Sequence, residues 1–384
     1  MEKPQIRKIS RTLWLNNQQA IPPSEKVKDS YASYADLFSL MPSSALRLLR
    51  EAEEDVRKLV GVTSSHMFHF VPHFPHIVRI IVSALLENSS VSQGRNHLIL
   101  PTHDQQLFID GICRRQGLAA TYDWVTANHE GRIVKEHIIE TLNSRTLLFS
   151  LSAAHGMLGV IQPIEQILNQ CNDRGVLLHL DISDILGRAP LTPPMLEADI
   201  ITFSATALGG IGSLGGMFIH KSLEPIFTPW FPEHRAGHLC FGSIAAMQTA
   251  CQERFSALPL FTFNTLNLRK QLIQELKQAC PSIQILFPEM ENSLPNIFVA
   301  AIPNFPAESL AFLLHQQGIY PGLGYERFQS LAQVLQNCGV PPVLCHNALH
   351  FALTERSKDL NFAILTRALN ASIKHLTPLL IHSP

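Results

Sequence analysis

The sequence has no paired cysteines, no long apolar run and no leader-like N-terminus. Its seven cysteines are scattered without a CxxC pair, which favours reduced thiols over a disulfide framework. The longest apolar run, residues 77–86, is interrupted by Arg79 and is much shorter than the roughly 20 residues that cross a bilayer. The first ten residues, MEKPQIRKIS, contain no apolar core of the kind that a signal peptide needs. Together these absences predict a cytoplasmic protein without a membrane-spanning segment.

An excess of charge of one sign is also missing. The chain holds 30 Lys and Arg residues against 31 Asp and Glu residues, a net charge of −1, and no basic block. Nucleic-acid-binding surfaces carry clustered positive charge, so a nucleic-acid partner is not expected. A hydrophobic fraction of 46% over 384 residues suffices for more than one core, which predicts two domains.

Apolar strands alternate with helices over the first two thirds of the chain. Strands are predicted at 97–100, 119–121, 146–150, 176–181, 200–204 and 216–220. Helices are predicted at 43–60, 104–116, 161–172 and 242–255. This alternation is typical of an α/β fold with a mostly parallel sheet that is covered on both faces.

The pattern changes near residue 258, where helices and short strands indicate a smaller α+β unit. Helices are predicted at 263–280, 307–317 and 358–376, and strands at 283–287 and 296–301. We therefore divide the chain into an irregular N-terminal segment (1–40), a large α/β domain (41–258) and a small C-terminal α+β domain (259–384).

The stretch DIITFSATALGGIGSLGGMFIHKS (199–222) combines a strand, a glycine-rich loop and a second strand. Such a loop can cradle an anionic group through its backbone donors, and Ser204 and Thr206 add hydroxyl donors. Between Ser204 and Gly216, however, there is no lysine, histidine, cysteine or carboxylate. The layout therefore predicts a site that lacks a reactive side chain.

Three stretches occur in an order that resembles a known family. They are SAAHGMLGVIQPI (152–164), LLHLDISDILGRAPL (177–191) and ADIITFSATALGG (198–210). The chain is similar over nearly its whole length to the class V aminotransferases, and within them to the cysteine desulfurases of the NifS/IscS kind. The resemblance implies a pyridoxal-phosphate enzyme of fold type I, which consists of a large cofactor domain and a small C-terminal domain. It also implies a homodimer that works in sulfur or iron–sulfur metabolism with assembly or sulfur-acceptor proteins.

The resemblance assigns cofactor roles to several side chains. Asp181 falls where the family pairs a carboxylate with the protonated pyridine nitrogen, which keeps the ring an electron sink. His103 falls where an imidazole stacks on the ring, and Ser204 and Thr206 fall where donors hold the phosphate. Two further positions depart from the pattern: His155 or Gly156 stands at an asparagine position, and Asp184 replaces a glutamine that donates to the phenolate oxygen.

Four chemical roles of the family have no matching residue. Ala207 stands at the position of the Schiff-base lysine, and Lys221 follows an intervening strand. The loop at 318–330, where desulfurases carry their nucleophilic cysteine, has none. His350 replaces the arginine that clamps the substrate carboxylate, a bidentate contact that histidine cannot copy. The phosphate loop should fall near 68–76, where two prolines remove backbone donors.

These losses predict a catalytically degenerate member of the family, a pseudoenzyme without a covalent cofactor. Two alternatives remain open. One is an active enzyme that holds pyridoxal phosphate non-covalently, and the other is a scaffold that binds a small anion or a protein. A zinc site made of His66, His69, His73 and His76 is disfavoured, because prolines break the helix that would align them.

Overall fold

The computed structural model describes most of the chain. The described residues are 13–17, 20–35, 42–72, 74–88, 94–104, 120–231, 239–287, 291–324, 329–355, 357 and 361–381. In this part of the chain no helix is both long and apolar enough to cross a membrane.

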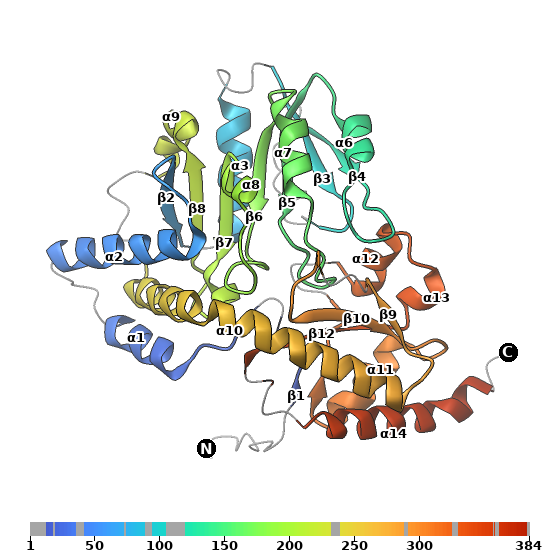
Figure 1. The fold of residues 1–384 in the computed structure, drawn as a ribbon. Helices are drawn as coiled ribbons and strands as arrows, with labels where there is room; N and C mark the ends of the chain where they lie inside the picture. Colours follow the sequence, from blue (N-terminus) through green and yellow to red (C-terminus); the bar gives the residue numbers. More distant parts are fainter. Residues whose placement is uncertain are drawn as a thin grey trace, which may run out of the picture.

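A seven-stranded sheet forms the centre of the larger part of the fold (Figure 1). In sheet order its strands are β2 (His66–Val71), β8 (Gly215–His220), β7 (Ile200–Ser204), β6 (Leu177–Asp181), β5 (Thr146–Ser152), β3 (His97–Pro101) and β4 (Thr121–Val125). Only β8 runs antiparallel to its neighbours, β2 and β7. The strands β3, β5 and β7 are buried at every position, as expected for a parallel sheet covered on both faces. The predicted α/β fold with a mostly parallel sheet is confirmed.

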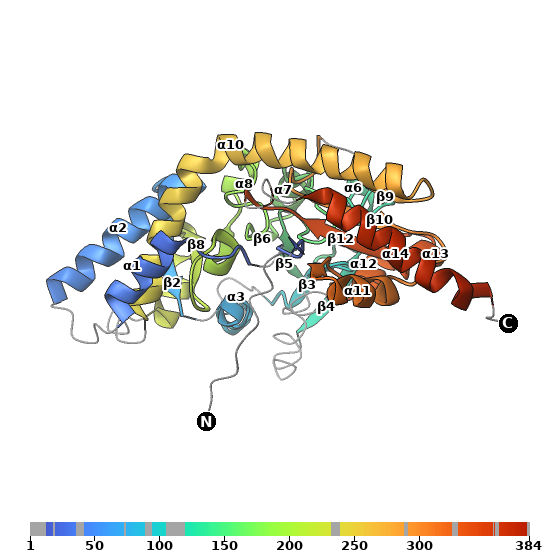
Figure 2. The same ribbon diagram turned by 90° about the horizontal axis from the view of Figure 1, so that it is seen from below.

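Helices cover both faces of this sheet. The helices α7 (Ile164–Asn172) and α3 (Phe74–Glu87) lie on opposite sides, as the two views together show (Figures 1 and 2). Shorter elements complete this part of the chain. They are α6 (Lys135–Thr141), α8 (Pro193–Leu196), α9 (Glu224–Phe227) and the 3-10 turns η2 (Ala205–Leu208), η3 (Lys221–Leu223) and η4 (Thr228–Trp230).

A second, antiparallel sheet lies beside the first in the order β12 (Ala348–Ala352), β10 (Ile297–Ala301), β9 (Gln284–Leu286). It has its own apolar core. Its helices are α11 (Ala307–Gln316), α12 (Leu331–Asn337), α13 (Pro342–Cys345) and α14 (Phe362–Ile381). The long helix α10 (Phe241–Ala279) runs along both sheets without a break at residue 258 (Figure 1). The domain limit at 258 therefore has no secondary-structure boundary and stays a prediction.

Some elements differ from the predictions. The segment 1–40 is not wholly irregular, because residues 25–35 form α1, which packs on α10 together with α2 (Pro42–Val60). Val27 is the only buried residue of α1, so its apolar pattern was too weak to predict a helix. Residues 66–71 form strand β2, within the stretch where a phosphate loop was expected. The helix predicted at 104–116 lies almost entirely outside the described residues.

The N-terminal segment also ties the two sheets together. We call residues 13–17 and 20–24 the N-terminal strap. Its strand β1 (Leu13–Trp14) pairs with β11 (Ile319–Tyr320). The amide of the buried Asn17 donates to the carbonyl of Ala352 in the small sheet (2.9 Å), and Ile21 N donates to the carbonyl of Thr206 (3.1 Å). The strap therefore covers the turn that follows β7.

Asn17→Ala should loosen this connection. The substitution leaves the Ala352 carbonyl without its Asn17 donor, so the free energy of unfolding should fall by about 1–3 kcal/mol in urea titrations. The matched control is Asn264→Ala at an exposed position of α10, which should change stability by less than about 0.5 kcal/mol. Equal effects of the two substitutions would mean that the hydrogen bonds of the Asn17 side chain contribute nothing measurable to stability.

Candidate functional site

The candidate site lies at the carboxyl ends of three neighbouring parallel strands. Ser152, Asp181 and Ser204 are the last residues of β5, β6 and β7. Ser152 pairs with Asp181, which in turn pairs with Thr202. Ligand sites of open α/β sheets form outside this edge, because strand ends and their loops converge there.

Asp181 and the two predicted phosphate ligands are brought together. The half-buried Asp181 accepts a hydrogen bond from Ser183 N through Oδ1 (2.8 Å). The hydroxyl of Ser183 accepts from Ser204 N (3.0 Å), and the Ser204 hydroxyl lies 2.8 Å from that of Thr206. A carboxylate and a pair of hydroxyls therefore share one edge of the sheet, where they could bind a polar ligand.

Ala207 lies inside the 3-10 turn η2 and is only 1% exposed. The fully buried Arg188 lies behind this turn. Its guanidinium donates to the carbonyls of Asp184 (2.8 Å) and Ala207 (3.4 Å), and Nη1 is 3.6 Å from the Asp184 carboxylate. Sequence reasoning missed Arg188, although a cation between the apolar residues Leu186 and Ala189 is a signal that could have found it.

Asp184 faces the protein interior on both sides. On one side is Arg188, and on the other is Gly156, where a β-carbon would lie 2.6 Å from the Asp184 carboxyl carbon. A larger residue at 156 would displace the carboxylate, so the glycine is required by this contact. Of the two residues considered for the asparagine position, Gly156 is the one that packs on Asp184.

His103 and His155 form a buried pair with ring centroids 5.3 Å apart. His155 Nε2 lies 2.8 Å from the carbonyl of His103, which can only accept, so Nε2 carries the proton. Its Nδ1 then accepts from Met157 N and Leu158 N (both 3.3 Å). Burial, and then the neighbouring His155, lower the pKa of His103 to about 3. His103 Nδ1 has no hydrogen-bond partner in the described residues.

His350 projects from β12 and is fully buried, and neither of its ring nitrogens has a hydrogen-bond partner in the described structure. Burial, and then His155, lower its pKa to about 3, so the ring is neutral. A β-carbon at Gly322 would lie 1.8 Å from Nε2, and Gly322 and His350 exchange backbone hydrogen bonds (2.9 and 3.0 Å). The loop after β11 is thus docked directly on this ring.

Lys221 lies away from the Ala207 turn, and part of the loop at 318–330 lies outside the described residues. Since Ser204 pairs with Gly215 and Ile200 with Ile219, Lys221 follows β8 at the opposite edge of the sheet. Cys338 and Cys345 are buried, and burial raises the pKa of both thiols. Residues 325–328 of the loop are not described.

The histidines of β2 do not share a face, because His66 and His69 are three residues apart on a strand. The ring of His66 forms a hydrogen bond with the carbonyl of Ala198 (2.8 Å). The ring of His69 stacks on Phe231. Burial lowers the pKa of both imidazoles. His73 lies outside the described residues, and among those described no group of His, Cys, Asp and Glu could hold a metal ion.

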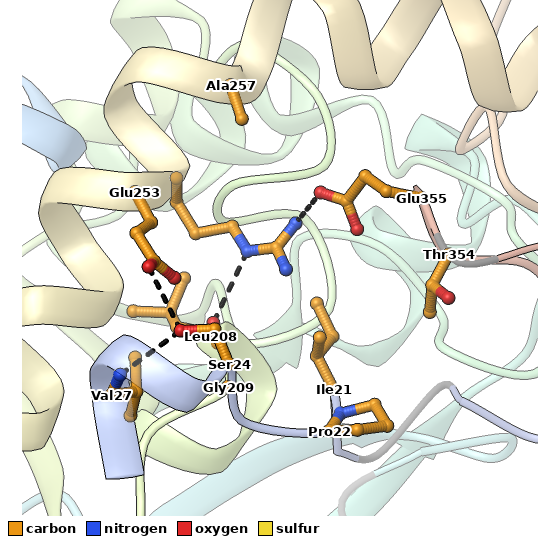
Figure 3. Close-up of a pocket in the computed structure, with 11 residues that line it drawn as sticks. Ile21, Pro22, Ser24, Val27, Leu208, Gly209, Glu253, Ala257, Thr354 and Glu355 are labelled. Carbon is orange, nitrogen blue, oxygen red and sulfur yellow. Dashed lines mark hydrogen bonds and ion pairs between the residues drawn. The ribbon is translucent and has the colours of Figure 1, made fainter. Parts of the chain in front are cut away.

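A cavity of about 220 Å³ lies beside the Ala207 turn (Figure 3). It is lined by Leu208 and Gly209, the strap, α10 and the Thr354–Glu355 segment after β12. Arg254 donates to the Glu355 carboxylate and to the carbonyl of Leu208, so it links α10 with the segments that follow β12 and β7. Among the described residues that line the cavity there is no lysine, cysteine or histidine, so these residues offer no amine, thiol or imidazole.

Comparisons with known proteins agree with this arrangement. The aminotransferase class-V family matches residues 24–236. The cysteine desulfurase IscS of Rickettsia massiliae (strain Mtu5) is 20% identical over 398 residues, which cover 98% of this chain and 95% of the relative. A solved NifS-like protein superposes with a TM-score of 0.79 at 19% identity, covering 95% of this chain and 99% of that one. The apo cysteine desulfurase of Thermococcus onnurineus NA1 also gives 0.79, at 12% identity and 95% coverage of both chains. The fold is thus that of the NifS-like structures.

The neutral buried imidazoles should make the protein acid-labile. An unfolded histidine takes up a proton near its usual pKa of 6.5, whereas His350 does so only near 3 in the folded state. The unfolded state therefore binds more protons, and stability should fall as the pH drops below about 6.5, by about 2 kcal/mol at pH 5 for this residue.

His350→Leu should make the loss of stability between pH 7 and pH 5 smaller, as measured by urea titration at each pH. The control is His129→Leu at an exposed position. An unchanged pH dependence in His350→Leu would mean that this imidazole is not neutral and buried in solution.

Proposed function

The chain belongs to the class V aminotransferase family, and from this premise we propose that it is a cysteine-desulfurase-like protein without desulfurase activity. The observation that carries the proposal is Ala207, a buried methyl group in the turn to which the family resemblance assigns the catalytic lysine. Lys221, the nearest lysine downstream, is at the opposite edge of the sheet. Formation of an imine needs an amine, so the turn cannot supply this step.

The residues do not fit covalently bound pyridoxal phosphate, on which the family's enzymes depend. Asp181 could still face a pyridinium nitrogen, and the Ser204 and Thr206 hydroxyls could still donate to a phosphate. However, the Asp184 carboxylate faces Arg188 and Gly156, and it cannot donate a hydrogen bond when ionised. The strap also covers the Ala207 turn through its bond to the Thr206 carbonyl. We therefore derive no catalytic step through this cofactor.

The substrate side supports the same conclusion. His350 is buried and neutral, and Gly322 contacts its ring, so it offers no bidentate cation for a carboxylate. No residue between 318 and 330 is a cysteine. A protein with this fold and without these groups is suited to binding rather than to turnover. We propose a cytoplasmic scaffold or regulator in sulfur or iron–sulfur metabolism, with sulfur-acceptor or assembly proteins as its partners.

We expect no covalent adduct between the wild-type protein and pyridoxal phosphate. After titration and borohydride reduction, mass spectrometry should find no pyridoxyl-lysine peptide, and cysteine should release no sulfide. Ala207→Lys should give a coloured, reducible adduct of low affinity, because Asp181 and the two hydroxyls remain. Sulfide release should still be absent in this variant, because the loop at 318–330 has no cysteine and residue 350 is a histidine instead of an arginine.

The matched control is Ala207→Met, which has a side chain of similar length without an amine. It should give no adduct, although it disturbs the buried turn in a comparable way. Sulfide release by the wild type would contradict the loss of activity. A pyridoxyl-lysine in the wild type would contradict the assigned position, and its sequence would identify the lysine that acts instead.

We also expect a homodimer. Fold type I proteins associate in this way, and the outer surface of α10 exposes large apolar side chains that favour association, namely Phe255, Leu260 and Phe263. Sedimentation velocity at micromolar concentration should give twice the mass of the 42.8 kDa chain. A compact monomer at this concentration would contradict the expected assembly.

A further inference from the structure

A second feature of the molecule lies away from the Ala207 turn, on the C-terminal half of α10. Here an open groove of about 540 Å³ runs between the helix and strand β9. We call it the α10–β9 groove. Its lining residues are Arg269, Lys270, Ile273, Gln274, Lys277, Gln278 and Ile285.

The six lining residues that belong to α10 lie on one face of the helix. They recur in pairs every four positions, which is close to one helical turn, while Leu272 and Leu276 between them are buried in the core. Lys270 and Lys277 are both exposed and are two turns apart, about 10.5 Å along the axis. Figure 2 shows this end of α10 on the outside of the molecule beside β9.

The described lining of the groove carries positive charge. Among the described residues that line it there are three cations and no carboxylate. Arg269 is only 1% exposed, and its guanidinium donates to the Ser293 hydroxyl (2.9 Å) and the Leu294 carbonyl (3.0 Å), while Nε has no partner. In the described residues no carboxylate pairs with Arg269. A buried cation without a counter-charge is costly, so an anion in the groove would be favoured.

The groove is also partly apolar and lies at a sheet edge. Ile273 and Ile285 are half-buried and contribute aliphatic surface between the two lysines. Strand β9 is the last strand of its sheet in the described structure, and edge strands are common docking sites for extended chains. An extended chain of five residues spans about 13 Å, so acidic side chains at its two ends can reach both lysines, which are about 10.5 Å apart along the helix.

We propose that the α10–β9 groove binds an extended, acidic segment of a protein partner. Its carboxylates pair with Lys270 and Lys277, and its aliphatic side chains pack on Ile273 and Ile285. The charge of Arg269 below the floor adds attraction without direct contact. This inference does not depend on the proposed function, because the groove is built by other residues than the Ala207 site.

The test measures fluorescence anisotropy of a labelled, capped peptide, Glu-Ile-Glu-Leu-Glu, with the full-length protein. Binding should weaken as NaCl is raised from about 0.05 to about 0.5 M, since exposed charge pairs are screened. The neutral peptide Gln-Ile-Gln-Leu-Gln should not bind. Lys270→Gln combined with Lys277→Gln should weaken binding about tenfold, because both contacts with carboxylates are lost.

The matched control combines Lys221→Gln with Lys374→Gln, which removes the same charge from exposed positions elsewhere. It should leave the affinity unchanged, and thermal unfolding should show that both double variants fold. Equal weakening in the two double variants would overturn the proposal, because the attraction would then follow net charge alone. No binding of the acidic peptide, or its displacement by inorganic phosphate at comparable concentration, would also overturn it.

Discussion

A fully buried guanidinium, that of Arg188, is the constraint around which the candidate site is arranged. A cation without water is costly unless acceptors surround it. Here the carbonyls of Ser183, Asp184 and Ala207 and the carboxylate of Asp184 supply them. These acceptors come from the segments that follow β6 and β7, so one side chain holds both in place. The shape of the Ala207 turn therefore does not depend on a reactive side chain at its centre.

Much of the fold could be predicted because its strands are continuous apolar runs. β5 and β7 are buried at every position, and their ends were predicted within two residues. Two of the elements that were missed depend on tertiary contacts. Helix α1 buries only Val27 and is held in place by its packing on α10. Strand β2 contains two histidines, and their burial depends on the segments of the chain that pack against this strand. Local patterns do not contain this information.

The candidate site was predictable to a similar extent. Asp181, Ser204 and Thr206 could be brought together because they end or follow adjacent strands of a predicted parallel sheet. The sequence could not show that Arg188 is fully buried or that Gly322 packs on the ring of His350. Gly322 and His350 are far apart in the chain, and the burial of Arg188 depends on how the segments after β6 and β7 dock.

Ala207 and His350, at the positions where the resemblance implies a lysine and an arginine, have one property in common: neither side chain is charged. A buried lysine or arginine loses hydration, and enzymes tolerate that cost because the charge does chemistry. Ala207 carries no charge, and His350 is neutral because burial lowers its pKa to about 3. The site therefore contains Arg188 and Asp184, whose charges hold its loops, and it has no lysine at 207 and no arginine at 350. In the non-catalytic protein that we propose, such changes would add stability. Exposed cations such as Lys270 and Lys277 lose little hydration, so a positive charge on the surface lowers the stability of the fold very little.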